Sequence, residues 1–317
     1  MKAVGSNLEV LWLAILSGIL TLLPVLVPVG GGLLTVLAPF PLIVLAVKYP
    51  WRYAVGLVGL EGGLLLLAGQ PQLLFFLGQC GLVALATAGA IRRGWSISPT
   101  IVGSLVAPLG IGALLLVVYS TLVQPLPHDL LTRYFDKAVS LSQQYVQALE
   151  RMQEGEEEQL AALVEALPQL ILAVLPALVI ISHLFINVLN YLLVRRYCQR
   201  SQPPLRLDPD DLLRWHASDY LVWVFLASGA AVLIPIDAVS TIGLNVLLVT
   251  LAIYLLQGMA IALFWGRRLP FPPGAQWLVG VAVFLIAGLL CVAVCTAVGL
   301  FDLWIDFRRQ RRHSWLP

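Results

Sequence analysis

Residues 241–265 read TIGLNVLLVTLAIYLLQGMAIALFW and include no charged side chain. An α-helix needs about 20 mostly apolar residues to cross the hydrocarbon core of a bilayer, so this stretch is long enough for one span. Backbone N–H and C=O groups find no water there, and a helix satisfies them within a single segment. The stretch therefore predicts a transmembrane helix and indicates the fold class of the chain.

The same pattern recurs along all 317 residues. Nine apolar runs reach or approach the length of a span, namely 10–29, 32–47, 53–69, 73–91, 99–123, 168–194, 218–235, 241–265 and 275–303. We therefore expect an all-α fold, a polytopic transmembrane helical bundle of about eight to nine spans in a lipid bilayer.

Composition supports a membrane protein and excludes several functions. Apolar residues make up 60% of the chain and charged residues only 11%, against about a quarter in soluble domains. A net charge of +2 gives none of the strongly basic character of nucleic-acid-binding proteins, so we expect no nucleic-acid partner. The four cysteines and four histidines show no metal-ligand spacing, and no catalytic motif is present. We expect no metal, no cofactor and no enzymatic activity.

Lysine and arginine residues predict the orientation. If the spans alternate, one side receives Lys2, Lys48, Arg52, Arg92, Arg93, Arg195, Arg196, Arg200, Arg206, Arg214, Arg267 and Arg268. By the positive-inside rule this side faces the cytoplasm, so the N-terminus lies on the cytoplasmic side of a bacterial inner membrane. Nine spans would leave the basic C-terminal tail outside. Either one run is not a full span, or the last segment is re-entrant, or the tail is an exception; we favour a cytoplasmic tail.

The segment 124–167 is the only large extramembrane piece and carries eight acidic and three basic residues. Its apolar residues recur at helical spacing, which predicts an amphipathic helical segment outside the membrane. It is either a solvated connector, or a docking surface or lid. We divide the chain into a six-helix membrane bundle at 1–196 that includes this segment, a basic cytoplasmic loop at 197–217, and C-terminal membrane helices at 218–317. The latter end in an interfacial basic tail whose arginines, Arg308 among them, are expected on lipid phosphate.

Two ionisable side chains fall at membrane depth. Glu61 lies about 14 Å along its run from Arg52, and His183 about 18 Å from Arg195, at the rise of ~1.5 Å per residue. Both would sit near the midplane, where they could pair. Because an ionisable group in a bilayer is costly unless paired, they form either a substrate or proton site, or contacts that hold neighbouring helices together.

Further polar residues extend this candidate site. His183, Asn187 and Asn190 recur at i, i+4 and i+7, which places them on one helical face. The candidate ligand-binding residues are Glu61, Gln79, His183, Asn187, Asn190, Asn245 and Gln257. They either line a cavity for a small polar ligand or bond helices to one another. If these residues share one water-filled pocket, ligand binding is favoured. If they make separate contacts between helices, a role in holding the bundle together is favoured.

Four stretches carry a resemblance over nearly the whole chain. They are 187–196 (NVLNYLLVRR), 215–223 (WHASDYLVW), 256–261 (LQGMAI) and 299–308 (GLFDLWIDFR). In this order they resemble the YybS-like family of bacterial membrane proteins, a domain of unknown function. The resemblance implies a polytopic membrane protein and assigns no functional residue.

The first six runs carry a more distant likeness. A glycine-rich bend at 30–32 and the start Pro39-Phe-Pro41-Leu of the second run are similar to membrane substrate-binding subunits of energy-coupling-factor vitamin transporters, and to the rod-shape protein MreD. Those subunits dock a partner through small residues on their first helix. The resemblance implies that Ala14 and Gly18, a small-xxx-small pair, dock a membrane-protein partner here.

The sequence therefore predicts an integral membrane protein, most simply a subunit for binding or transporting a small molecule. The alternative is a non-catalytic scaffold or interaction protein of the cell envelope. The three runs after 217 and the acidic segment have no counterpart in the transporter subunits.

Overall fold

The structure is a computed structural model, and it describes residues 2–27, 34–67, 76–122, 157–200, 213, 215–268, 270 and 272–308. All regular structure in these ranges is helical, and they contain no strand. The predicted class, an all-α membrane bundle, is confirmed.

The N-terminal helices pack around a short central helix. They are α1 (Lys2–Leu26), the 3₁₀ turn η1 (Thr35–Leu37), α3 (Pro39–Lys48), α4 (Trp51–Leu67), the π-helical η2 (Phe76–Leu82), α6 (Val83–Arg92) and α7 (Ile97–Leu122). The central helix α3 is buried along most of its length and contacts α1, α4, α6 and α9. Its apolar side chains form the core of this N-terminal group.

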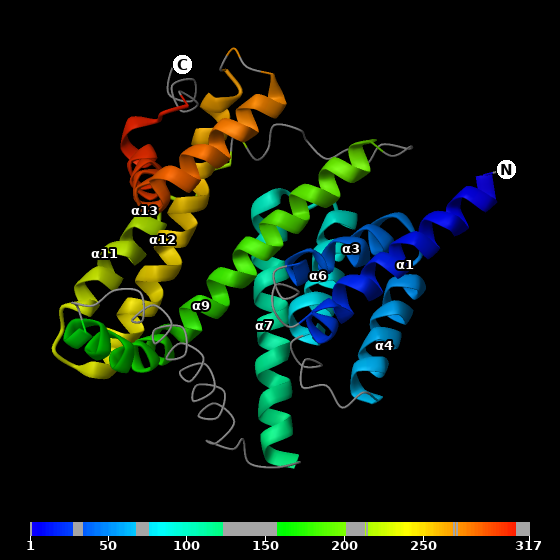
Figure 1. The fold of residues 1–317 in the computed structure, drawn as a ribbon, viewed down its shortest axis with the longest axis horizontal. Helices are drawn as coiled ribbons and strands as arrows, with labels where there is room; N and C mark the ends of the chain where they lie inside the picture. The colour runs from blue at the N-terminus through cyan, green and yellow to red at the C-terminus, as the bar shows by residue number, and fades with distance from the viewer. Residues whose placement is uncertain are drawn as a thin grey trace.

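The longest helix, α9 (Glu157–Arg200), links the two halves of the molecule (Figure 1). It contacts α3, α6 and α7 on one side and α12 on the other. Because α9 is helical from Glu157 onward, the end of the predicted outer segment belongs to the same helix as the following span. The rest of that segment, up to residue 156, lies outside the described residues, as does most of the predicted basic loop.

The C-terminal helices form a second group, made of α11 (Leu221–Val232), α12 (Asp237–Gly266) and α13 (Pro273–Ile305). The helix α12 contains the uncharged stretch 241–265 and packs against both of the others as well as α9. It therefore connects this C-terminal group to the N-terminal group.

Three described segments are long and apolar enough to cross a membrane, namely Ala173–Arg200, Ala238–Gly266 and Ile286–Ile305. Shorter apolar helices are Asn7–Leu23, Thr35–Lys48, Cys80–Arg92, Ile97–Gly112 and Leu221–Val232. Each of the nine predicted runs overlaps a helix. The number of complete crossings stays a prediction.

The run 275–303 is not one straight helix. Gly288 has φ 35° and ψ −108° inside α13, and such a positive φ favours glycine over other residues. A straight helix would place Asp302 about 44 Å from Pro273. Yet the Asp302 carboxylate is bonded to Gln257, less than three turns before the end of α12. The break at Gly288 lets the chain return to α12.

Polar contacts join several helix ends at one end of the molecule. The Arg92 guanidinium donates to the Tyr49 carbonyl at 2.5 Å, and the Trp215 indole N–H donates to the Ser98 hydroxyl at 2.7 Å. Arg308 in turn donates to the Trp215 carbonyl at 2.7 Å. We call this the basic end. Arg308, the last described residue, thus lies at the same end of the molecule as Arg92 at the end of α6.

Candidate functional site

Glu61 is buried between α1 and α4, with 5% of its surface exposed. One carboxylate oxygen accepts a hydrogen bond from the Thr21 hydroxyl at 3.1 Å. The Ser17 hydroxyl lies beside the same carboxylate, but it makes no hydrogen bond of good geometry. The second oxygen of Glu61 has no partner within the described part of the chain. Glu61 therefore holds α4 to α1 and keeps one acceptor unused.

His183 and Glu61 do not pair. The His183 ring is half-buried, and its Nδ1 lies 2.8 Å from the Val179 carbonyl of the same helix. Similar depth brings two residues together only if their helices also turn them toward each other. Here Glu61 faces α1 instead.

Asn187 and Asn190 lie on the buried face of α9. The Asn190 amide nitrogen donates to the Val36 carbonyl of η1 and to the Ile186 carbonyl, both at 2.8 Å. Asn187 is 1% exposed, and neither atom of its side-chain amide has a partner among the described residues. The Asn190 amide oxygen is likewise unpaired there. Two of the three residues in the predicted stripe are therefore buried, with hydrogen-bonding capacity left over.

Thr87 lies on α6, a helix that contacts α9, and was not predicted. Its neighbours Ala84 and Ala88 and the α9 residues Leu184 and Tyr191 share one buried apolar cluster, and α6 contacts α9. The Thr87 hydroxyl is fully buried and has no partner within the described ranges. A threonine in an alanine-rich helix gives no sequence signal of this kind, because it is also a common packing residue.

Asn245 of α12 bridges a weak point in α9. Its side-chain oxygen accepts the Ala177 backbone N–H at 2.8 Å, and its nitrogen donates to the Ala173 carbonyl at 2.7 Å. In an undistorted helix those two backbone groups bond to each other. Pro176 disrupts this turn, because proline lacks an N–H and its ring clashes with the preceding turn. Asn245 is therefore a contact between two helices.

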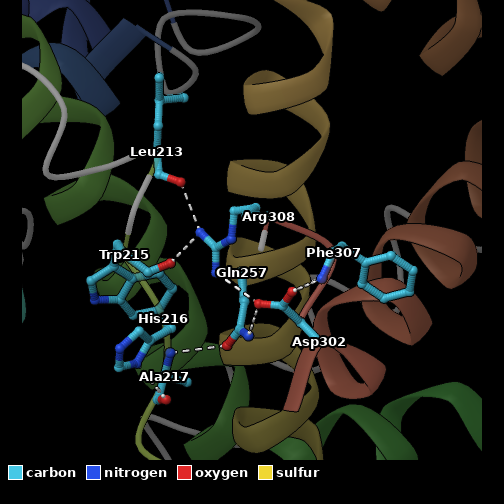
Figure 2. A network of polar contacts seen from close by, with 8 residues as sticks. All are labelled: Leu213, Trp215, His216, Ala217, Gln257, Asp302, Phe307 and Arg308. Carbon is cyan, nitrogen blue, oxygen red and sulfur yellow. Dashed lines mark hydrogen bonds and ion pairs between the residues drawn. The ribbon is translucent and has the colours of Figure 1, made fainter. Parts of the chain in front are cut away.

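Gln257 belongs to a separate network at the basic end (Figure 2). Its side-chain oxygen accepts the Ala217 N–H at 2.9 Å, and its nitrogen donates to the Asp302 carboxylate at 3.0 Å. That carboxylate also accepts the Phe307 N–H and forms an ion pair with Arg308 at 2.7 Å. We call Gln257, Asp302 and Arg308 the C-terminal network.

The structure buries Arg308 rather than placing it on lipid phosphate. Its side chain is 2% exposed, and it also donates to the carbonyls of Leu213 and Trp215 at 2.8 and 2.7 Å. The sequence favoured an interfacial arginine because Trp304 and several further arginines lie nearby. The decisive partners are backbone carbonyls more than ninety residues earlier, which no local pattern reveals.

A close helix crossing supports this network. A Cβ atom added to Gly258 would lie 1.7 Å from the Cys295 carbonyl oxygen, and one added to Gly299 would lie 1.9 Å from that of Tyr254. Only glycine allows backbones to approach so closely. The helices α12 and α13 therefore touch through their backbones beside the C-terminal network.

The sequence also missed a second polar cluster at the basic end, which we call the Glu9 cluster. The Glu9 carboxylate of α1 forms an ion pair with Lys48 and accepts the hydroxyls of Tyr49 and Tyr197 at 2.7 and 2.8 Å. Burial, together with the hydrogen bond to Glu9, raises the pKa of the Tyr49 hydroxyl, so it stays protonated and can donate. The cluster holds α1, the end of α3 and α9 together.

Comparison with known protein families assigns most of the chain to a single family. A family model described as "Predicted membrane protein (DUF2232)" matches residues 15–303. The chain belongs to the DUF2232 family. The matched region includes Glu61, Asn187 and the crossing of α12 and α13. No curated protein and no solved structure matches this DUF2232 chain.

The predicted site residues of this DUF2232 protein therefore lie in at least three places. Glu61 faces α1, the two asparagines of α9 lie toward η1 and the core, and Asn245 and Gln257 make contacts of α12. The side chain of Gln79 lies outside the described part of the structure. No group of metal-ligating residues occurs among the described residues.

Ala14 and Gly18 lie on a partly exposed face of α1. A Cβ added to Gly18 would meet no described atom within 4 Å. Gly18 therefore makes no close contact with another described helix. Its role in docking a membrane partner stays a prediction.

Proposed function

We propose that this DUF2232 protein is a non-enzymatic subunit of the bacterial cytoplasmic membrane that binds a small polar solute between α6 and α9. In this arrangement the N-terminus and the basic end face the cytoplasm, as the positive-inside rule predicts. The likeness to transporter substrate-binding subunits would make the bound solute a transported one.

The observation that carries the proposal is Asn187, a buried side-chain amide with neither atom paired among the described residues. An unsatisfied buried polar group costs about 1–3 kcal/mol, so native proteins rarely keep one without water or a ligand to satisfy it. The hydroxyl of Thr87 and the amide oxygen of Asn190 offer further bonds on the same two helices.

The contrast between the two helix groups supports this location. The described buried polar atoms without partners belong to Ser17, Glu61, Thr87, Asn187 and Asn190, which lie on helices of the N-terminal group and on α9. In the C-terminal network, by comparison, each polar side chain is bonded. Among the described buried residues, spare hydrogen-bonding capacity therefore lies in the N-terminal group and on α9. The unpaired groups of Thr87, Asn187 and Asn190 carry no charge, which suits a neutral solute with several hydrogen-bonding groups.

The test is thermal unfolding of the full-length protein in detergent with a panel of water-soluble vitamins, amino acids and nucleobases. At least one compound should raise the midpoint temperature. Asn187→Leu and Thr87→Val should abolish or weaken that increase. Thr250→Val is the matched control, because the buried Thr250 hydroxyl bonds within its own helix in α12. No response across the panel, or an unchanged response in Asn187→Leu, would reject the proposal.

The scaffold alternative rests on the segment 124–167, on the basic loop at 195–214 and on the likeness to MreD. Most of that segment and most of the loop lie outside the described residues, and this alternative stays a prediction. Crosslinking from this segment in intact cells would test it separately.

A further inference from the structure

We propose that a cavity between α1, α3 and α9 binds one anionic phospholipid, with its headgroup at the basic end. The cavity has a volume of about 390 Å³, within the range of roughly 300–1,000 Å³ that ligand pockets occupy. Its inner wall is apolar and consists of Leu16, Leu20, Leu37, Phe40 and Leu193. Its outer rim is formed by Arg196, Tyr197 and Arg200 near the end of α9.

The rim is positively charged and suits a phosphate group. Arg196 and Arg200 lie one turn apart and are exposed, and neither makes a hydrogen bond or ion pair with any described residue. The carboxylate beside the rim is that of Glu9, which is already occupied by Lys48, Tyr49 and Tyr197. Within the described part of the chain the two guanidinium groups therefore have no competing carboxylate, and arginine is well suited to bind phosphate through paired hydrogen bonds.

The depth of the cavity matches one acyl chain. Glu9 lies level with Tyr197, because the two side chains are hydrogen-bonded. From Glu9, Leu20 lies about 16 Å further along α1 at the rise of ~1.5 Å per residue. This is about half of a hydrocarbon core of ~30 Å. A lipid tail of one leaflet would cover the apolar wall while its phosphate reached the arginines, an arrangement known for basic pockets between membrane helices.

The apolar wall distinguishes a phospholipid from a soluble anion. A free phosphate would use only the two arginines and leave the leucines and Phe40 uncovered. Burial of apolar surface contributes about 25 cal/mol per Å², so a tail on this wall adds affinity that a water-soluble phosphate cannot gain. We therefore assign the cavity to a lipid.

This site is separate from the proposed solute site. Leu193, Arg196 and Arg200 form one stripe along α9, at i, i+3 and i+7. Asn187 and Asn190 lie on the buried face of the same helix. Failure of either proposal leaves the other open, because the two sets of side chains can be changed independently.

The test is native mass spectrometry of the full-length, delipidated protein titrated with dioleoyl phosphatidylglycerol, dioleoyl phosphatidylcholine or glycerol 3-phosphate. Phosphatidylglycerol should bind most tightly. A basic residue near an anionic headgroup contributes about a fivefold gain in affinity, so Arg196→Gln/Arg200→Gln should bind it about 30-fold more weakly. The matched control is Arg52→Gln/Arg93→Gln, which removes two exposed arginines at the basic end that do not line the cavity.

Three results would overturn the proposal. Equal affinity of the wild-type protein for the two phospholipids would show that the arginines do not select an anionic headgroup. Glycerol 3-phosphate binding as tightly as phosphatidylglycerol would show a phosphate site without a lipid tail. An equal loss in the test and control variants would show a general charge effect. The first two comparisons use the wild-type protein, so they hold even if a variant misfolds.

Discussion

Replacing Arg308 by methionine tests whether the C-terminal network is internal to the protein. The substitution removes the ion pair to Asp302 and the hydrogen bonds to the Leu213 and Trp215 carbonyls. Breaking a buried ion pair by removing one partner costs about 3–5 kcal/mol, because the other charge stays buried. We therefore expect Arg308→Met to lower the free energy of unfolding by about 4 kcal/mol.

The assay is unfolding of the purified protein in mixed micelles by titration with sodium dodecyl sulfate, followed by circular dichroism. Asp302→Asn should cost a similar amount, and the double variant should cost at least about 2 kcal/mol less than the two single losses added together, since contacting residues couple strongly. The exposed Arg267→Met is the control, with an expected change within about 0.5 kcal/mol. A loss below about 1 kcal/mol for Arg308→Met would match an exposed arginine on lipid and refute the buried pair, as would strict additivity in the cycle.

Three further predictions use the same titration. In the absence of added solute, Asn187→Leu should keep or raise the free energy of unfolding, by up to about 1–3 kcal/mol, because it removes an unpaired buried amide; a clear loss would mean that Asn187 is bonded. Gly258→Ala should lower the free energy of unfolding by about 1–3 kcal/mol, because the added methyl group overlaps the Cys295 carbonyl. Gly229→Ala, whose methyl group would meet no atom within 4 Å, should leave it unchanged. Equal effects of the two substitutions would contradict the close crossing of α12 and α13. Asn245→Leu should cost about 2 kcal/mol by leaving two backbone groups of α9 unpaired. Adding Pro176→Ala to this variant should recover part of the loss. A full loss in the double variant would show that Pro176 does not create the need for Asn245.

The positions of the helices along the chain could be predicted from the sequence, but the rotation of each helix about its axis could not. Hydropathy along the chain records which stretches avoid water, so each apolar run overlaps a helix. It does not record how each helix is rotated, which is why Glu61 and His183 at similar depth do not meet. The break at Gly288 was also missed, because a glycine within an apolar run is common in membrane helices.

The polar residues of the spans illustrate the same limit. Asn245 and Gln257 were correctly noticed as polar groups at membrane depth, yet their partners are backbone groups of distant segments. The sequence could not separate a ligand contact from a helix contact, since both need the same amide. Arg308 shows the opposite error, where a local pattern typical of an interface concealed a buried ion pair.

The helix α9 determines how the functional proposals can be separated. Its buried face presents Asn187 and Asn190 toward the core, the stripe with Arg196 and Arg200 lines the cavity, and Asn245 bonds to the turn that contains its proline. Because an α-helix makes one turn every 3.6 residues, these three sets of contacts occupy different faces or depths of one helix. A variant on one face should therefore leave the others intact. If changes at Asn187 altered lipid selectivity as strongly as changes at the arginines, α9 would have to move as a whole, and the two sites would be coupled rather than merely adjacent.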